Sequence, residues 1–487
     1  MRLKEKYLLL LILILFLFVY SIVSLFNHLV FRTYALDLGL YTNALYQYSH
    51  FNLANCNVFK NDYALLLSDH FDLYLVLFSP LVYLFGSFTL LIIQILFIVF
   101  GAYGVFLYFK DAELNHSKVA LLSMLYFLTF FGVFSALSFD YHSNVIAASV
   151  VPWFLYFLKQ GKRSKAFYLF IFILIAKENM AIWLVFVCLG LLLQERRNKL
   201  NSTFLIYLIL IALIYFVTVV GYVMPHFSVS GKYDGFKYSS IGTNPLQALQ
   251  TILTRPFYSL KLLFINPTEN QSLDWIKCEF HFFVLLSGLY LLLFRPSYLI
   301  MLIPIYMQKM YHNDSSMWGI AKQYSIEFVP ILTIGIFSVI TEFKSTGFSK
   351  FMKYFVLISS VVVTIRSMDH TMTYTKKSTV RFYQEVHYKN TFNVSNAQMA
   401  LKLLPENAKI SALSFFVPHL ALRKNIYQFP IVKDAEYIVF NYSDDFYPLN
   451  SPKFISEIAD YLSSGNWTYL LNSPDIAILK RNQAGRH

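Results

Sequence analysis

Acidic, histidine and lysine side chains are scarce in this sequence, and several of them lie at the ends of long apolar segments. Charged residues make up 14% of the chain, whereas hydrophobic residues make up 57%. A polar or ionisable side chain that borders or interrupts an apolar segment is costly to bury, so such residues usually serve a function. The candidates are Asp37, Asp62, Asp69, His70, Asp72, Asp140, His142, Lys177, Glu178, Gln323 and Tyr324.

These residue types would suit a group-transfer reaction. A carboxylate such as Asp37 can accept the proton of a hydroxyl acceptor. A lysine such as Lys177 can stabilise the charge that develops on a phosphate leaving group. Each also has a structural alternative. Asp37 can cap the helix that follows it, and Lys177 can pair with Glu178, although adjacent helical residues point apart.

The two histidines, His70 and His142, have two interpretations. They can line the same site, or they can hydrogen-bond to the backbone at the membrane surface. Asp69-His70 is too short a motif to define a metal site, so a divalent ion stays an open alternative. The three cysteines form no CxxC pair. Cys56 and Cys278 are expected on the same side of the membrane, where they either bridge or stay unpaired.

Apolar segments follow one another from residue 7 to residue 368, which is typical of a multi-pass membrane protein. Lysine and arginine gather at nearly every second break, beginning with Arg2, Lys4 and Lys6. This pattern predicts a cytoplasmic N-terminus and an extracytoplasmic C-terminus. The net charge of +13 then belongs largely to cytoplasmic loops that meet anionic lipid, which argues against nucleic-acid binding.

We predict a transmembrane domain over residues 1–368, with about eleven crossings and two outer loops, 29–72 and 225–277. Residues 71–86 are apolar but short, and they either lie at the interface or dip into the membrane. The expected apolar helices are residues 7–28, 87–109, 119–137, a helix ending at 159, 166–176, 181–193, 204–224, 280–294, 298–311, 326–340 and 354–368.

The pair 166–176 and 181–193 is unusual because basic residues flank it on both sides, including Arg196 and Arg197. The pair must therefore start and end on the cytoplasmic side, and its tip at Lys177 must be reached from inside. A helix of about 11 residues spans roughly 16 Å, which is too short for a hydrocarbon core of about 30 Å. Either the tip at Lys177 lines a water-filled cavity, or the pair is one helix with a buried charge. We favour the cavity, where polar backbone is tolerated.

From residue 369 to residue 487 the composition is that of a small soluble α/β domain, which is expected outside the membrane. Ser451-Pro452 is a good start for a helix, with an N-cap followed by proline. The expected elements are helices 396–404 and 451–462, strands 409–413 and 436–442, and a hairpin of 467–471 with 476–479.

Several short motifs occur in a recognisable order along nearly the whole chain. They are Asp37–Gly39, Asp69–Phe71, Phe139–His142, Ala176–Ala181, Leu253–Pro256, Gln323–Tyr324 and Val417–His419. Their order resembles that of a bacterial domain-of-unknown-function family of predicted multi-pass membrane proteins. That family in turn looks like the C-type (GT-C) superfamily of membrane glycosyltransferases.

The resemblance implies a GT-C-like enzyme of the bacterial plasma membrane. It would move a sugar from a polyprenyl-phosphate donor to a glycan, lipid or protein acceptor on the outer face. Asp37 fits the acid of the first outer loop, and Lys177 fits the residue that contacts the donor phosphate. The other pocket residues would be Asp69, His70, Asp140, His142, Glu178, Gln323 and Tyr324.

Two positions depart from the expected pattern of that family. Asp72 and Leu73 stand where Ser-Pro would follow the histidine and phenylalanine, and Gln323 stands where a histidine is expected. Two rival functions stay open. Broken helices with a charge at the break are typical of transporters and flippases, but we find no paired halves with matching interruptions. The third alternative is a non-catalytic membrane scaffold whose outer domain recruits partners.

Overall fold

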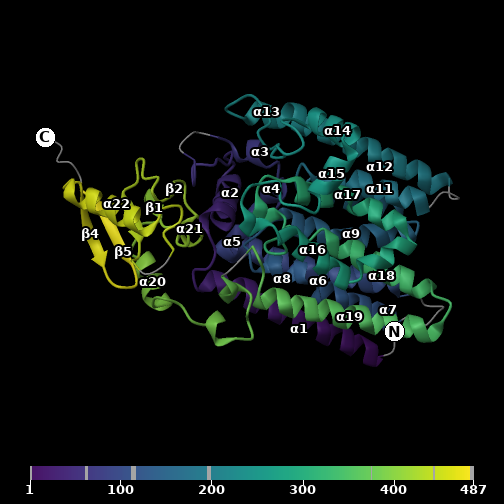
Figure 1. Ribbon diagram of the computed structural model, residues 1–487. Coiled ribbons are helices and arrows are strands. Elements are labelled where there is room, and N and C mark those ends of the chain that lie inside the picture. The colour runs from purple at the N-terminus through teal and green to yellow at the C-terminus, as the bar shows by residue number, and fades with distance from the viewer. Residues whose placement is uncertain are drawn as a thin grey trace.

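The computed structural model describes residues 3–60, 64–110, 117–194, 199–373, 376–442 and 445–482. Asp62, Arg2, Arg196 and Arg197 lie outside these residues. Most of the chain forms a bundle of helices with roughly parallel axes, and a small sheet lies at one end of it (Figure 1). We call that end of the bundle the sheet end.

The helices of the bundle account for most of the apolar segments expected from the sequence. They are α1 (Leu3–Leu29), α6 (Thr89–Phe109), α7 (Ser117–Thr129), α8 (Phe131–Leu137), α9 (Ser143–Lys159), α10 (Arg163–Leu174), α11 (Met180–Gln194), α12 (Lys199–Thr218), α16 (Ile276–Leu286), α17 (Pro296–Tyr311), α18 (Phe328–Glu342) and α19 (Thr346–Asp369).

The long apolar helices confirm a membrane protein. Four continuous helical stretches in the described residues are long and apolar enough to cross a bilayer: Lys4–Leu29, Tyr74–Phe109, Leu200–Phe227 and Thr346–Asp369. A bent pair over residues 118–137 raises the number to five. The count of about eleven crossings is not confirmed and stays a prediction.

The helix expected over 119–137 is in fact two helices that meet at 42°. Phe130 between them has an extended backbone, with φ −68° and ψ 138°. The bend accompanies a close approach of the chain, because a Cβ atom on Gly132 would lie only 2.7 Å from the carbonyl oxygen of Ser325. A backbone contact of this kind is not visible in the hydropathy pattern.

The short pair around Lys177 is also two helices. α10 ends at Leu174, α11 begins at Met180, and the residues between them form turns. The alternative of one continuous helix is therefore wrong. The backbone N–H of Leu73 donates to the carbonyl oxygen of Ile175 at 3.2 Å, so this turn lies against the first long loop.

Short helical turns fill the connections between the long helices. In the first loop they are η1 (Ala35–Gly39), α2 (Leu40–Ser49) and α3 (Leu66–Asp69). The next four, α4 (Tyr74–Phe78), η2 (Ser79–Leu81), α5 (Val82–Phe85) and η3 (Gly86–Phe88), continue into α6 as the stretch Tyr74–Phe109. η4 (Val219–Val223) and α13 (Met224–Phe227) continue α12 as the stretch Leu200–Phe227. The later connections contain α14 (Pro245–Thr254), α15 (Pro256–Leu262), η5 (Gln271–Leu273), η6 (Leu289–Phe294) and η7 (Ser315–Met317).

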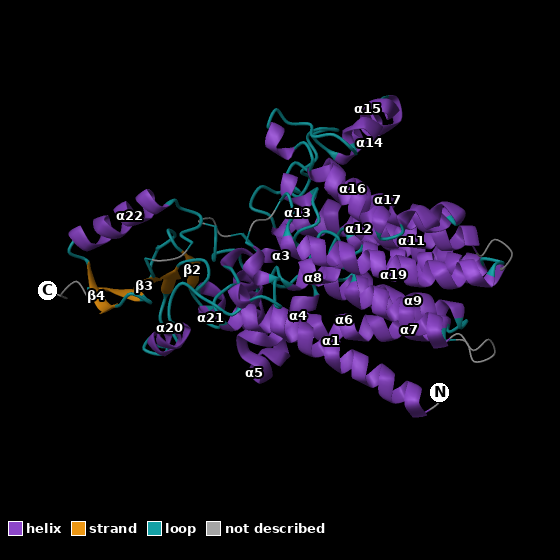
Figure 2. Cartoon of the chain, turned by 60° about the horizontal axis from the view of Figure 1, so that its bottom comes forward, coloured by secondary structure: helices purple, strands orange, loops and turns teal. Residues whose placement is uncertain are grey.

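The C-terminal region contains a five-stranded mixed sheet with the order β2-β1-β3-β5-β4. Its strands are the orange segments of Figure 2. β1 pairs in parallel with β2 and β3, whereas β5 pairs antiparallel with β3 and β4, which confirms the closing hairpin. The elements are η8 (Lys377–Thr379), η9 (Glu385–His387), α20 (Val394–Leu401), β1 (Ile410–Ala412), α21 (Val417–Leu420), β2 (Ile426–Gln428), β3 (Tyr437–Phe440), α22 (Ser451–Ser463), β4 (Trp467–Asn472) and β5 (Ala477–Arg481).

The sheet region is held directly on the first loop. The side-chain amide of Asn43 donates to the carbonyl oxygens of Ala421 at 2.9 Å and Arg423 at 2.8 Å. A Cβ atom on Gly39 would lie 2.8 Å from Val417, so the turn η1 and the helix α21 are in close contact. The predicted boundary after residue 368 stays a prediction. The regions on either side of it share an interface at the turn that carries Asp37.

Candidate functional site

Asp37 lies in η1, a single π-helical turn at the sheet end of the bundle. The carboxylate of Asp140 holds both ends of this turn, because its Oδ2 accepts hydrogen bonds from the backbone N–H of Tyr34 at 2.9 Å and of Leu38 at 3.5 Å. The following helix α2 begins without a side-chain cap. The alternative that Asp37 caps this helix is therefore wrong, and Asp140 is the aspartate that binds backbone.

Gln94 fixes the loop that presents Asp140 and His142. Its side-chain nitrogen donates to the carbonyl oxygen of Asp140 at 3.0 Å, and its Oε1 accepts from the N–H of His142 at 2.9 Å. Asp140 itself has a left-handed backbone, with φ 53°. Our sequence interpretation missed Gln94. The available signal was a single amide inside the apolar helix α6, where a polar side chain needs a partner.

The imidazole of His142 faces Asp37. Its Nε2 lies 3.9 Å from Oδ1 of Asp37, and the ring stacks on Phe139 with centroids 5.7 Å apart. Burial has the largest effect on the pKa of His142, followed by Lys177, His70 and Lys322. Together they lower the pKa of His142 well below its usual value. The imidazole is therefore neutral near pH 7, and its Nε2 has no hydrogen-bond partner among the described residues.

Asp37 is half-buried, with 26% of its side chain exposed. Burial raises the pKa of its carboxyl group to about 6, while Lys322, Lys177 and His70 oppose the rise. A carboxyl group that titrates near neutral pH is suited to accept a proton from a substrate. Asp37 and Lys177 thus lie within electrostatic range of each other.

The loop before α18 supplies a second cation that we had not placed in the site. Lys322 has a left-handed backbone, with φ 63°, and its ammonium lies 4.9 Å from the ring centre of Phe139. Among the charges that oppose the rise in the Asp37 pKa, that of Lys322 has the largest effect. Its position directly before the predicted pair Gln323-Tyr324 was the signal that could have identified it.

The two predicted neighbours of Lys322 lie in the same region. Gln323 is buried, and its Oε1 has no hydrogen-bond partner within the described part of the chain. Burial, and then the charge of Asp37, raises the pKa of the Tyr324 hydroxyl. The structure therefore brings Tyr324 together with Asp37.

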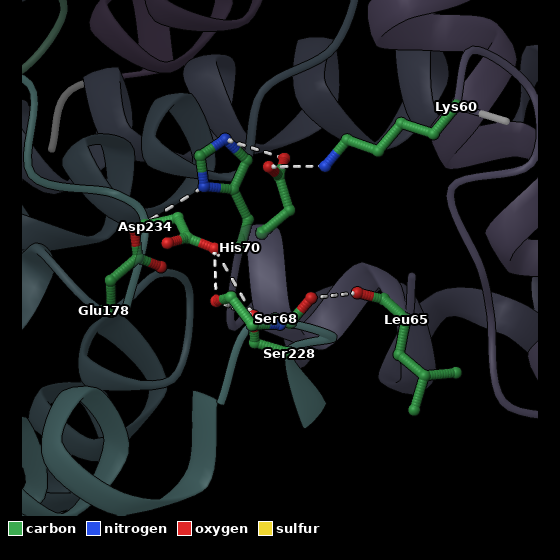
Figure 3. Close-up of polar contacts among 9 residues, drawn as sticks. Lys60, Leu65, Ser68, His70, Glu178, Ser228 and Asp234 are labelled. Atoms are coloured by element: carbon green, nitrogen blue, oxygen red, sulfur yellow. Dashed lines mark hydrogen bonds and ion pairs between the residues drawn. The ribbon is translucent and has the colours of Figure 1, made fainter. Parts of the chain in front are cut away.

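A second cluster surrounds His70 (Figure 3). Its Nδ1 lies 3.5 Å from Oε1 of Glu178, and its Nε2 lies 3.8 Å from Oδ2 of Asp69. Lys60 contacts the other oxygen of Asp69 at 3.4 Å. Burial favours the neutral form of Asp69, but His70, Lys60 and Lys177 outweigh it and lower its pKa.

Lys177 and Glu178 do not form an ion pair with each other alone. Glu178 accepts a hydrogen bond from the N–H of Phe71 at 3.1 Å and faces His70. Burial works against its ionisation, but His70 and Lys177 hold the pKa of Glu178 below its usual value. Within the ranges described, the ammonium of Lys177 makes no hydrogen bond or ion pair. This cation acts on Asp37 as well as on Glu178, so it links the two clusters.

Asp72 has a structural role. It is buried, and its Oδ1 accepts a hydrogen bond from the N–H of Tyr74 at 2.9 Å, at the start of α4. Burial raises the pKa of Asp72 to about 7, and the hydroxyl of Ser143 and the charge of Lys177 oppose this rise. Asp72 is thus a second carboxyl group that changes charge near neutral pH.

The described residues contain no group of three or more histidine, cysteine, aspartate or glutamate side chains that could hold a metal ion. The structure therefore assigns no ligands to the divalent ion that the sequence left open. Cys56, Cys188 and Cys278 are free thiols, so the bridge considered between Cys56 and Cys278 is not formed.

Comparison with known protein families identifies the family of this chain. A family described as "Predicted membrane protein (DUF2079)" matches residues 27–456. The chain belongs to this family. The match covers the whole candidate site, and it agrees with the family resemblance drawn from the motifs. No curated protein matches the chain. The family description names no activity, so function must be argued from the site.

Proposed function

We propose that this protein is a GT-C-type membrane glycosyltransferase. It moves a sugar from a polyprenyl-phosphate donor to a hydroxyl acceptor at the outer face of the bacterial plasma membrane. One observation carries the proposal: the half-buried carboxyl group of Asp37, with a pKa near 6, lies beside a neutral histidine and within range of two lysines from different segments.

In the proposed reaction, Asp37 accepts the proton of the acceptor hydroxyl as its oxygen forms a bond to the anomeric carbon. The bond between that carbon and the phosphate oxygen breaks at the same time, and the lipid phosphate leaves with the electron pair. Lys177 stabilises the charge on this leaving group, and Lys322 is the second cation available to it. The proton on Asp37 is later lost to water.

The other residues position these groups. Asp140 and Gln94 hold the turn and the loop that carry Asp37 and His142. His70, Asp69 and Glu178 form the charged surroundings of Lys177, and Gln323 and Tyr324 lie beside Lys322. In this scheme the two ammonium groups near Asp37 neutralise the leaving phosphate, so the scheme requires no divalent metal ion.

The direct test measures transfer from a polyprenyl-phosphate hexose by the full chain in lipid nanodiscs. Asp37→Asn keeps the shape of the side chain but removes the base, so we expect turnover to fall at least about 100-fold. The matched control is Asp274→Asn, an exposed carboxylate that contacts Asn266 at 2.9 Å. Full turnover by Asp37→Asn would exclude this mechanism. Movement of labelled lipid across sealed vesicles without a covalent product would instead identify a flippase.

A further inference from the structure

An apolar groove separates two helices of the bundle. It lies between α16 and α19 and has a volume of about 580 Å³. Phe282 and Val362 are exposed side chains in its wall, and Cys278 also lines it. Because α19 belongs to a stretch that is long and apolar enough to cross the membrane, hydrocarbon chains are the natural surroundings of this groove.

A cation lies at the groove's polar end. Arg366, in the last turn of α19, donates to the carbonyl oxygen of His370 at 3.0 Å, and it forms no ion pair with a carboxylate among the described residues. The neighbouring Glu279 is engaged otherwise, because it accepts the backbone N–H of Met372 at 3.1 Å. A guanidinium in this situation can bind a phosphate through two parallel hydrogen bonds.

The charges around Arg366 favour an anion. Lys377 lies within electrostatic range of Arg366, Arg381, Glu279 and Asp369, which gives three cations against two carboxylates. One of those carboxylates, Asp369, is already 3.6 Å from Arg381. Arg366 and Glu279 both line this end of the groove, and Lys377 lines the neighbouring small pocket. The surplus positive charge therefore borders the apolar groove, which is favourable for an anionic lipid.

We propose that the groove between α16 and α19 binds an anionic phospholipid, with one acyl chain along the groove and the phosphate at Arg366. This site is separate from the proposed glycosyl transfer and does not depend on it. It nevertheless borders the region of Lys322. Ser367 directly follows the groove-lining Arg366, and Thr371 directly precedes the groove-lining Met372. Ser367 and Thr371 line a separate small pocket together with Lys322.

Cys278 is a native reporter for this site, since it lines the groove and is exposed, whereas Cys56 and Cys188 are buried. The full chain in phosphatidylcholine nanodiscs is treated with a maleimide while phosphatidylglycerol is added. We expect phosphatidylglycerol to slow alkylation of Cys278 several-fold, and extra phosphatidylcholine to leave the rate unchanged. Equal protection by both lipids would overturn the proposal.

Two variants separate the phosphate contact from the groove. In Arg366→Gln we expect the half-protecting concentration of phosphatidylglycerol to rise about tenfold, and Arg255→Gln, another exposed arginine, should leave it unchanged. Val362→Trp should fill the groove and abolish the lipid effect. Ile358→Trp is the control, because Ile358 lies on the same helix and is equally exposed, at 60% against 59% for Val362. Of these two residues, only Val362 lines the groove. If phosphatidylglycerol protects Cys278 in both Arg366→Gln and Val362→Trp as it does in the wild type, the groove is not the lipid site.

Discussion

The charged groups of the C-terminal sheet and those around Asp37 are arranged in opposite ways. In the sheet region, Lys409 contacts Asp434 at 2.6 Å, and both side chains are well exposed. Slight burial favours the neutral form of Asp434, but hydrogen bonds from Lys409 and Tyr427 outweigh this effect and lower the pKa of Asp434. At the sheet end of the bundle, Asp37 and His142 are 3.9 Å apart and poorly exposed, and burial raises the pKa of Asp37 to about 6.

The difference separates exposed charged groups that pair with one another from buried polar groups that have no hydrogen-bond partner among the described residues. Exposed pairs are satisfied by each other and by water, so little would change if one were removed. Around Asp37, by contrast, Nε2 of His142 and Oε1 of Gln323 are buried without hydrogen-bond partners in the described residues. Such unsatisfied groups are costly, and a substrate that binds there would supply the missing partners. Four predictions test this contrast.

The largest effect is expected from Asp140→Ala. The change leaves the N–H groups of Tyr34 and Leu38 without their acceptor, at a cost of about 1–3 kcal/mol in the free energy of unfolding, and it releases the turn that carries Asp37. Turnover should fall at least about 100-fold. Thermal unfolding and transfer assays measure both effects. Asp434→Ala in the sheet is the control and should keep normal turnover; a loss as large there would erase the contrast.

Asp37→Asn should stabilise the protein while it removes activity. A carboxyl group whose folded pKa lies above its unfolded value destabilises the fold when ionised, and this cost grows as pH rises from about 4 through about 6. The variant should therefore gain up to about 3 kcal/mol at pH 8 and nothing at pH 3. Unfolding at the two pH values decides the matter, and a variant less stable than the wild type at pH 8 would contradict the assigned pKa.

The two lysines should tune the pH dependence of turnover. With Asp37 as the base, activity should rise with pH through a midpoint near 6. Lys322→Gln removes the cation with the largest effect on Asp37, so the midpoint should move upward by about one pH unit. Lys177→Gln should move it upward by less and should also lower the rate. Lys261→Gln, on the exposed helix α15, serves as the control. A downward shift in either site variant would refute the electrostatic assignment.

The smallest effect is expected at the exposed pairs of the sheet. Lys409→Gln breaks the contact with Asp434, and we expect it to change the free energy of unfolding by less than about 1 kcal/mol. High salt should reduce even this difference, because exposed pairs are screened. Urea unfolding at low and high salt provides the measurement. A cost as large as that of Asp140→Ala would mean that the two regions do not differ in kind.

Hydropathy predicted most of the long helices, because a helix that faces lipid must be apolar along its length. The ends of α6, α11 and α17 lie within a few residues of the predicted ones. The bend before Phe131 was missed, since it accompanies the contact of Gly132 with a distant carbonyl group. The strand β2 was missed for a similar reason: it has only three residues and is defined by pairing with β1.

The candidate site was predicted in part. Composition and position identified the polar residues near the ends of the apolar helices, and the structure places Asp37, His142, Lys177 and Tyr324 near one another. The role of Asp140 was not predictable, because an aspartate that binds a substrate and one that binds backbone look the same in a sequence. Its hydrogen bonds to the turn at Tyr34 join residues more than one hundred positions apart.

The sequence by itself determined that this chain enters a membrane and where its scarce charged groups fall, because both depend on the local alternation of apolar and polar residues. Only the tertiary structure decided which of those groups meet. The carboxylate of Asp37, the imidazole of His142 and the ammonium of Lys322 come from three distant segments, and their burial and mutual distances set the protonation of the site. Those quantities arise from packing between segments that are distant in the chain, which no local pattern encodes.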